Sequence, residues 1–215
     1  MGIYAGWIYR QFTVKPKPLD KDVRLDGKTV IVIGANVGLG LKAAKEMAAY
    51  GLAWLILESP GIEVLVWPLD YESFPSLDEF GTRAAKLDRF DLVILNAGLK
   101  NLSAGPAKLE MDIVINTVTP GFCASSLHKA NPQASKAVNL LAWTAAQGGH
   151  CLTDAVSLHG EHHGAYLSEQ EGKPPSSFVL SHKGSEARSK IWNETIKVLE
   201  AEAPHVEVLA TLNLL

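Results

Sequence analysis

The glycines of the segment Gly34-Ala35-Asn36-Val37-Gly38-Leu39-Gly40 have the spacing of a loop that binds a diphosphate. Gly34 permits a tight turn where an apolar strand ends, and Gly38 lets the backbone approach a phosphate because it carries no Cβ. Gly40 lets the following helix pack closely on the strand. The N–H groups of the loop and the positive end of the helix face the same charge. The segment therefore predicts a dinucleotide-binding site; the alternative is an ordinary βα turn without a ligand.

Polar residues and a tight turn also follow other apolar runs of the chain. Asp70 comes directly after Leu69, Asn96 follows the run 91–95, and Pro120-Gly121 forms a turn. The ligand crevice of a parallel sheet lies beyond the carboxyl ends of its strands. We therefore expect these residues to face a cofactor together with the glycine loop. Taken alone, Asp70 would cap the next segment and Asn96 would satisfy a turn.

The elements that must position these residues alternate between strands and helices. Strands are predicted at 29–33, 53–57, 62–67, 91–96 and 111–116, and helices at 39–48, 76–87, 134–155 and 186–202. Continuous apolar strands between helices indicate a parallel sheet buried on both faces, which is an open α/β fold. Ser76 and Glu79 form a capping box at one predicted helix start. Gly148-Gly149 is expected to interrupt the helix at 134–155.

One connection between predicted strands is unusually short. Only Ser59-Pro60-Gly61 separates Glu58 from Ile62. Parallel neighbours joined by a helix need a crossover of about a dozen residues or more. We therefore expect the strands at 53–57 and 62–67 to form a tight hairpin, unless one of them is not a true strand.

The 215 residues fit one domain, and the apolar content of 47% is normal for a globular protein. We divide the chain into an N-terminal extension (1–27), a single α/β domain (28–203) and a C-terminal tail (204–215). The extension begins with apolar residues that fall on one helical face, followed by the helix-breaking segment Lys15-Pro16-Lys17-Pro18. We expect this arm to pack on the body of the domain; an anchor for a membrane surface or a partner is the alternative.

Composition argues against several classes of protein. A net charge of −3 is not that of a nucleic-acid binder. No apolar run approaches the ~20 residues of a membrane span, and the start does not resemble a secretory signal. Two cysteines are too few for a disulfide framework, so a reducing compartment, the cytoplasm, is expected.

Histidines and cysteines offer other chemistry, which we weigh as follows. The spacing His159-x-x-His162-His163 provides two or three nitrogens without a fixed carboxylate or thiolate partner, so we expect no metal site. Cys123 follows the Pro-Gly turn, but no nearby basic residue in the sequence would lower its pKa. An ordinary half-buried thiol is therefore expected there.

The ordered motifs together resemble the short-chain dehydrogenase/reductase family, in particular fungal members that act in secondary metabolism. Gly34 to Gly40 resembles the family's phosphate loop, and Leu69-Asp70 resembles the pair that contacts the adenine. Asn96-Ala97-Gly98 resembles the motif that lines the adenine ribose. The segment Thr119 to Ser125 resembles the turn beside the nicotinamide, with Ser125 where the family often has threonine. The resemblance covers most of residues 10–200.

The resemblance implies a Rossmann-like, doubly wound parallel sheet, shortened by internal deletions, that binds NADP or NAD and acts on a carbonyl or alcohol of a small metabolite. Glu58 stands where an acidic residue would bind the ribose of NAD, whereas the fungal relatives favour NADP. The implied cofactor-binding residues are Gly34, Asn36, Val37, Gly38, Leu39, Gly40, Asp70, Asn96, Ala97, Gly98, Pro120, Gly121 and Ser125.

The family's proton-transfer pair, a tyrosine with a lysine four residues later, is missing from the sequence. None of the five tyrosines is followed by such a lysine, so we assign no catalytic residue. The space between Asn96 and Pro120 is too short for the strand and helices that carry this machinery, and a second gap lies near Glu58. Because the missing helices form the family's dimer interface, we expect a monomer or a different oligomer. The chain is then a reductase with altered chemistry, a nucleotide-binding remnant without redox activity, or the product of an incomplete gene model.

Overall fold

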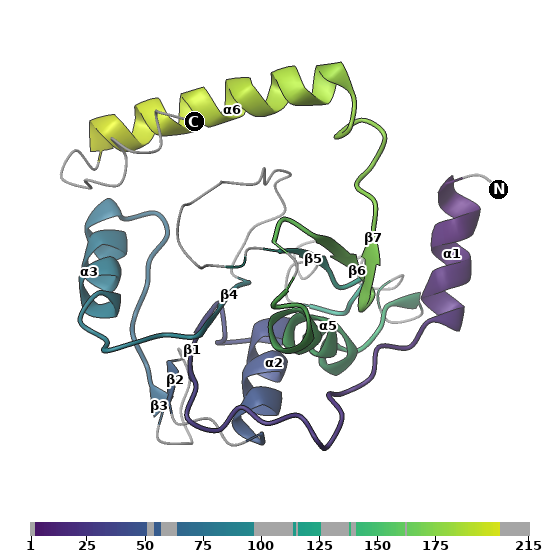
Figure 1. Cartoon of the computed structure of the whole chain (residues 1–215), viewed down its shortest axis with the longest axis horizontal. Helices are drawn as coiled ribbons and strands as arrows, with labels where there is room; N and C mark the ends of the chain where they lie inside the picture. Colours follow the sequence, from purple (N-terminus) through teal and green to yellow (C-terminus); the bar gives the residue numbers. More distant parts are fainter. Residues whose placement is uncertain are drawn as a thin grey trace.

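The computed structural model describes residues 3–50, 54–56, 64–96, 114, 116–125, 138, 141–161 and 163–202. It is a mixed α/β structure with parallel strands, as the sequence predicts (Figure 1). The elements are α1 (Ile3–Thr13), β1 (Thr29–Ile33), α2 (Gly38–Ala48), β2 (Trp54–Ile56), β3 (Val64–Leu65), α3 (Phe74–Ala84), β4 (Leu92–Leu95), β5 (Thr117–Thr119), α5 (Ala145–Leu158), β6 (Tyr166–Ser168), β7 (Glu171–Lys173) and α6 (His182–Glu202).

The strands of the described residues form two sheets rather than one. The first has the order β3-β2-β1-β4 with all pairs parallel, and the second has the order β5-β6-β7. In the second sheet β5 and β6 are parallel, whereas β6 and β7 form an antiparallel hairpin that the sequence analysis did not predict. Strand order reverses between β1 and β4, and such a switch point is where open α/β sheets bind their ligands.

The pairing of β2 with β3 contradicts the expected hairpin. The two strands are parallel neighbours, with Leu55 opposite Val64 and Ile56 opposite Leu65. Their shortness explains how this is possible without a helical crossover. The chain has to retrace only about 10 Å to return to the start of a three-residue strand. The seven residues between Ile56 and Val64 reach up to about 23 Å when extended.

Several predicted element boundaries are also wrong, among them the starts of α3, α5, α6 and β5. α3 starts at Phe74, and its N-cap is Ser73, whose side chain accepts a hydrogen bond from Ser76 N. Pro75 fits in the first turn, where no intrahelical donor is needed, so the helix starts earlier than predicted. The strand predicted at 111–116 lies mostly outside the described residues. Its two described members, Val114 and Asn116, are not in a strand, and β5 begins one residue later.

The core lies between the first sheet and the helices α2 and α5. Its buried residues are Leu25, Val30, Val32, Ala35, Ala43, Ala44, Met47, Ile94 and Leu152. Contrary to the prediction, Gly148-Gly149 does not interrupt a helix but lies buried inside α5. A Cβ at Gly148 would be 2.6 Å from Leu39 Cδ2, and a Cβ at Gly149 would be 2.9 Å from Lys42 Cβ. The two glycines therefore let α5 pack closely on α2.

Burial on both faces, expected for every strand, holds for β1 but not for β4. In β1 the residues Thr29 to Val32 are all buried. In β4 only Ile94 is buried, whereas Val93 is 38% exposed and Leu95 is 76% exposed. The face of β4 that carries Val93 and Leu95 is therefore open to solvent.

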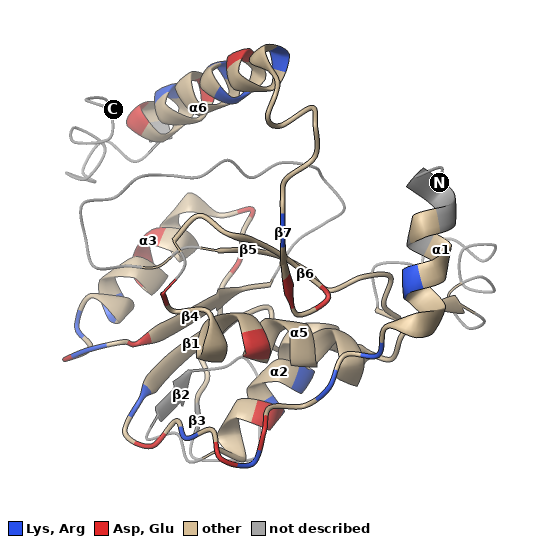
Figure 2. Ribbon diagram, turned by 45° about the vertical axis from the view of Figure 1, so that its right-hand side comes forward, with Lys and Arg blue, Asp and Glu red and all other residues tan. Residues whose placement is uncertain are grey.

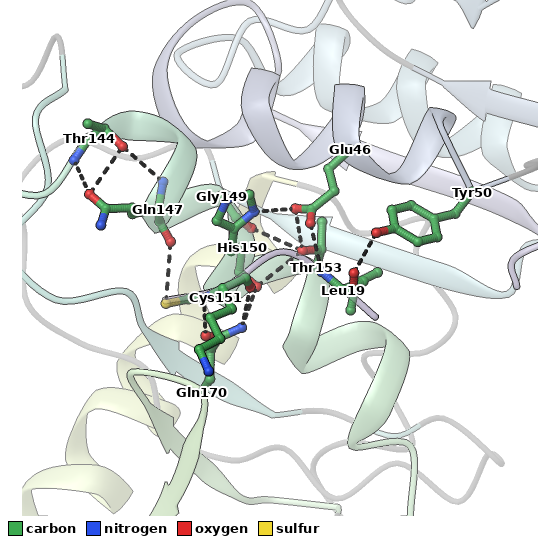
Figure 3. Close-up of polar contacts among 11 residues, drawn as sticks. Leu19, Glu46, Tyr50, Thr144, Gln147, Gly149, His150, Cys151, Thr153 and Gln170 are labelled. Atoms are coloured by element: carbon green, nitrogen blue, oxygen red, sulfur yellow. Dashed lines mark hydrogen bonds and ion pairs between the residues drawn. The ribbon is translucent and has the colours of Figure 1, made fainter. Parts of the chain in front are cut away.

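The N-terminal arm packs on the body, as expected. Figure 1 shows α1 beside the β6–β7 hairpin, and the chain then runs past α2 to reach β1. Arg10 of α1 forms a 3.2 Å ion pair with Glu169 in the hairpin turn. Further along, Leu19 N donates a 3.0 Å hydrogen bond to Glu46 Oε1 in α2, and the Tyr50 hydroxyl donates to the Leu19 carbonyl (Figure 3).

The last helix, α6, lies on the opposite side of the sheets from α2 and α5 (Figures 1 and 2). Figure 2 shows basic and acidic residues along its length. None of the helices in the described part of the chain is both long enough and apolar enough to cross a membrane.

Candidate functional site

The glycine loop begins where β1 ends, beside the switch point of the four-stranded sheet. Gly34 and Gly38 have φ angles of 79° and 66°, in the left-handed region that favours glycine. Val37 is the N-cap residue of α2, and its side chain makes no capping hydrogen bond. The N–H groups of the first helical turn therefore have no side-chain partner from the N-cap. Such a helix N-terminus favours an anion.

The close approach predicted at Gly40 is present. A Cβ at this position would overlap the Gly34 carbonyl oxygen and would lie 2.6 Å from Asn96 Nδ2. Asn96 Nδ2 donates a 3.2 Å hydrogen bond to the Gly34 carbonyl, and Asn96 N donates to the Ile33 carbonyl over 3.0 Å. Asn96 thus ties the end of β4 to the start of the loop. A tight backbone curve with glycines at its points of close approach, at a helix N-terminus, fits the diphosphate of a dinucleotide.

The other loop residues divide between solvent and core. Asn36 and Val37 are exposed at the loop, with Val37 47% exposed. Leu39 packs its side chain against the core, so only its backbone can face a ligand. The uncharged loop sequence means that attraction for a phosphate comes from backbone N–H groups.

The Pro120-Gly121 turn is built around a buried tryptophan. Gly121 has a φ of 76°, and a Cβ there would lie 2.5 Å from Cζ3 of the Trp143 ring. The Cys123 thiol donates a 3.1 Å hydrogen bond to the Pro120 carbonyl. The turn is therefore fixed both by its own polar contact and by the ring against which Gly121 packs.

The turn and the glycine loop meet in the structure. A Cβ at Gly38 would be 3.9 Å from the Cβ of Ser125, which is an ordinary van der Waals distance. On the α5 side, a Cβ at Gly148 would lie 2.7 Å from Cys123 Sγ and 2.8 Å from Leu39 Cγ. Segments some 80 residues apart in the sequence thus form one surface at the ends of β1, β4 and β5.

Asp70 is not brought to this surface by any described contact. Its backbone N–H donates to the Ser76 hydroxyl over 2.9 Å, and its Oδ1 accepts a 2.9 Å hydrogen bond from Glu72 N. These are the local contacts of a turn that leads into α3. The predicted cofactor residues Ala97 and Gly98 lie outside the described residues, as does Glu58.

The thiols of this region are protonated at neutral pH. Burial raises the pKa of the Cys123 thiol to about 12. Burial also raises the pKa of the Cys151 thiol to about 12, with smaller contributions from Cys123, Asp154 and Glu169. A nucleophilic cysteine needs a lowered pKa, so neither thiol has the properties of a nucleophile.

The structure describes His159 and His163 of the histidine cluster for which we expect no metal site. His162 lies outside the described residues, and His159 Nε2 lies 3.0 Å from Asp154 Oδ2. Burial raises the pKa of Asp154, and His159 opposes that shift. Within the described residues no three His, Cys, Asp or Glu side chains are grouped so as to hold a metal ion.

Sequence reasoning missed two residues that shape the site. Trp143 falls in a segment predicted to be helical, where an apolar residue signals only a core position. Gln11 lies in the N-terminal arm, and its side chain donates to the Phe122 carbonyl over 3.0 Å. The only signal in the sequence was the Pro120-Gly121 pair itself, which indicates a turn but not the residues that pack against it.

Comparisons with known proteins point to one group of enzymes. The chain is 35% identical over 281 residues to the short chain dehydrogenase sol3 of Alternaria solani, covering 79% of this chain and 99% of that protein. The short chain dehydrogenase virL of Hypocrea virens is 40% identical over 111 residues, covering 44% of this chain and 32% of that protein. The short chain dehydrogenase/reductase dmxR8 of a Cryptosporiopsis species is 23% identical over 322 residues, covering 94% and 98%. No family model matches the chain.

Proposed function

The chain belongs to the short-chain dehydrogenase family, and from this premise we propose that it binds NADP or NAD at the loop from Gly34 to Gly40. The observation that carries the proposal is the geometry of Gly40. The backbone of Gly40 lies so close to the Gly34 carbonyl and to Asn96 that no Cβ fits there. It lies in the first turn of α2, whose N-terminus has no side-chain cap. This arrangement lies at the switch point between β1 and β4, where an open α/β sheet binds its ligand.

Each part of the surface has a role in this proposal. The first-turn N–H groups of α2 hold the diphosphate, and Asn96 keeps the loop in the shape that exposes them. The turn from Pro120 to Ser125 borders the nicotinamide end of the site. A bound nicotinamide supplies hydride transfer to or from a carbonyl or alcohol carbon. The resemblance to fungal members favours NADP and a small secondary metabolite as substrate.

Proton transfer is the step for which this chain lacks the family's residues. No tyrosine is followed by a lysine four residues later. Two described phenols already have partners: the Tyr50 hydroxyl donates to the Leu19 carbonyl, and the Tyr166 hydroxyl accepts from Thr119 Oγ1 over 3.0 Å. The sol3 alignment spans 281 residues, although it covers 79% of a 215-residue chain. The relative therefore has residues without a counterpart here, which supports the proposed internal deletions.

The missing pair favours a second candidate function, a dinucleotide-binding protein without redox activity. Titration of the purified protein with NADPH and NADH, followed by fluorescence, tests the binding that both candidates share. Hydride transfer to a panel of carbonyl compounds then separates them, because turnover requires another acid in place of the tyrosine. We expect binding without turnover. Absence of binding to either dinucleotide contradicts both candidates, and sequencing of the transcript tests whether a gene model has lost the intervening exons.

We also propose that the chain is a monomer, because the family's dimer helices have no space between Asn96 and Pro120. Size-exclusion chromatography with light scattering should give a mass close to 23.2 kDa. A dimer of twice that mass whose contacts map to this connection would contradict the deletion.

A further inference from the structure

We propose that the N-terminal arm completes the nicotinamide end of the cofactor site, with Gln11 as the positioning residue that fixes the turn from Pro120 to Ser125. This inference rests on the proposed function, because it assigns a role to a residue outside the α/β domain in binding the same dinucleotide. The arm would then determine how the protein holds the reactive half of the cofactor, and not only how it folds.

Gln11 differs from its neighbours on α1 in burial and in contacts. Its exposed fraction is 5%, whereas Ile8, Tyr9 and Phe12 are each at least 50% exposed. Its amide Nε2 donates to two backbone carbonyls, that of Phe122 at 3.0 Å and that of Leu141 at 2.9 Å. A single buried amide thus joins α1 to the turn and to the segment that leads into α5.

The backbone of Gln11 also takes part in the contact between α1 and the turn, because its carbonyl accepts a hydrogen bond. Trp143 Nε1 donates a buried 2.8 Å hydrogen bond to the Gln11 carbonyl. The same tryptophan donates through its backbone N–H to the Phe122 carbonyl and accepts from Ala124 N, both at 2.8 Å. The Phe122 carbonyl therefore accepts from two donors at once, which satisfies both of its lone pairs. The ring of Trp143, in turn, fills the space beneath Gly121.

The two halves of the candidate site are held by different residues. Asn96 holds the glycine loop through its hydrogen bond to the Gly34 carbonyl, and the loop's left-handed turns are formed by glycines. None of the described hydrogen bonds of Gln11 reaches this loop. The turn is held by Gln11 and Trp143, together with the hydrogen bond from Cys123 to the Pro120 carbonyl. Among the described residues it approaches the start of α2 at Ser125, which lies against Gly38. Loss of the Gln11 amide should therefore affect the nicotinamide half and spare the diphosphate and adenine half.

The variant Gln11→Met tests this separation, since methionine keeps the length of the side chain and removes both donors. We expect its affinity for NADPH or NADH to fall about tenfold, because a turn that Gln11 no longer fixes has to be ordered when the nicotinamide binds. Affinity for ADP-ribose or 2′,5′-ADP, which lack the nicotinamide, should stay within about twofold of wild type. Amide hydrogen exchange at residues 122–124 and 143 should become faster without any ligand. The exposed neighbour Phe12→Ala is the matched control and should change neither affinity.

Several outcomes would overturn the inference. Unchanged NADPH affinity in Gln11→Met means that the arm does not position the turn, and equal losses for NADPH and ADP-ribose mean a general structural role. Wild-type protein that binds no dinucleotide removes the proposed function itself, a failure seen before any variant is compared. If Gln11→Met does not fold, Trp143→Phe removes the indole donor to Gln11 and keeps a ring beneath Gly121. Trp143→Phe should lower affinity for NADPH more than affinity for ADP-ribose, by a smaller margin than Gln11→Met does. Equal losses for NADPH and ADP-ribose would again overturn the inference.

Discussion

Gly40→Ala is expected to weaken dinucleotide binding at least a hundredfold and to destabilise the loop at the end of β1. The added methyl group would overlap the Gly34 carbonyl oxygen and lie 2.6 Å from Asn96 Nδ2. Neither atom can move away freely, because Gly34 is held in a left-handed turn and Asn96 Nδ2 donates its hydrogen bond to the Gly34 carbonyl itself. Relief requires α2 to shift outward, which breaks the Asn96 hydrogen bond and moves the helix N-terminus. We expect a loss of at least a hundredfold in affinity and about 1–3 kcal/mol in the free energy of unfolding.

Gly81→Ala is the matched control for this prediction. Gly81 is also a helical glycine, in α3, and a Cβ there would meet no atom within 4 Å. Alanine should therefore leave affinity unchanged and raise stability by up to about 1 kcal/mol through helix propensity. Isothermal titration with NADPH and urea denaturation measure both quantities for both variants. A Gly40→Ala protein that binds as well as wild type would remove the loop from the site.

The part of the candidate site around Gly40 could be predicted from the sequence. β1, the glycine loop and α2 follow local rules: an apolar run, residues with permitted positive φ, and an amphipathic helix. The structure places them within a residue of their predicted bounds. Asn96 was also predicted, because the end of a parallel strand at a switch point must face the crevice.

The β6–β7 hairpin could not be predicted, because its turn lacks the usual residues. Ser168 pairs with Glu171, so Glu169 and Gln170 form a two-residue turn, and both have positive φ angles of 59° and 68°. Asn-Gly is the normal sequence signal for such a turn. Here the backbone strain is offset by contacts distant in sequence: Glu169 pairs with Arg10, and the Gln170 amide exchanges hydrogen bonds with both backbone groups of Lys17. The sequence of residues 166–173 alone gives no sign of these contacts with Arg10 and Lys17.

The same limit applies to the arm and to the division of the strands between two sheets. Gln11 is an ordinary polar residue in the sequence, and its role depends on carbonyls 111 and 130 residues away. The division of the described strands between two sheets is a matter of which strands pair, and no pattern within a single strand records that. Most of residues 97–116 lie outside the described part of the chain. Local pattern thus predicted both the glycine loop and the Pro120-Gly121 turn of the candidate site, whereas the contacts of Gln11 and Trp143 that hold the turn are tertiary.

A buried carboxylate in α2 holds the arm at its second attachment point (Figure 3). The side chain of Glu46 is 9% exposed. Its Oε1 accepts from Leu19 N at 3.0 Å, and its Oε2 accepts from the Thr153 hydroxyl at 2.7 Å and lies 2.8 Å from His150 Nδ1. Three segments, the arm, α2 and α5, therefore converge on one side chain.

Glu46→Ala is expected to lower the free energy of unfolding by about 3 kcal/mol. The loss is large because the Leu19 N–H loses its acceptor and the half-buried His150 ring loses its carboxylate partner, whereas the Thr153 hydroxyl still donates to the His150 carbonyl at 3.1 Å. Each buried group left unsatisfied costs about 1–3 kcal/mol before relaxation. Glu46→Gln keeps one oxygen acceptor and the side-chain volume, so it should lose less. Glu79→Ala is the control, since that carboxylate is 65% exposed and pairs with Arg83 on the surface of α3, where an ion pair contributes under about 1 kcal/mol. Urea denaturation followed by circular dichroism measures all three variants. Equal losses in Glu46→Ala and Glu79→Ala would mean that water replaces the carboxylate and that the arm is held by Gln11 and the hairpin turn instead.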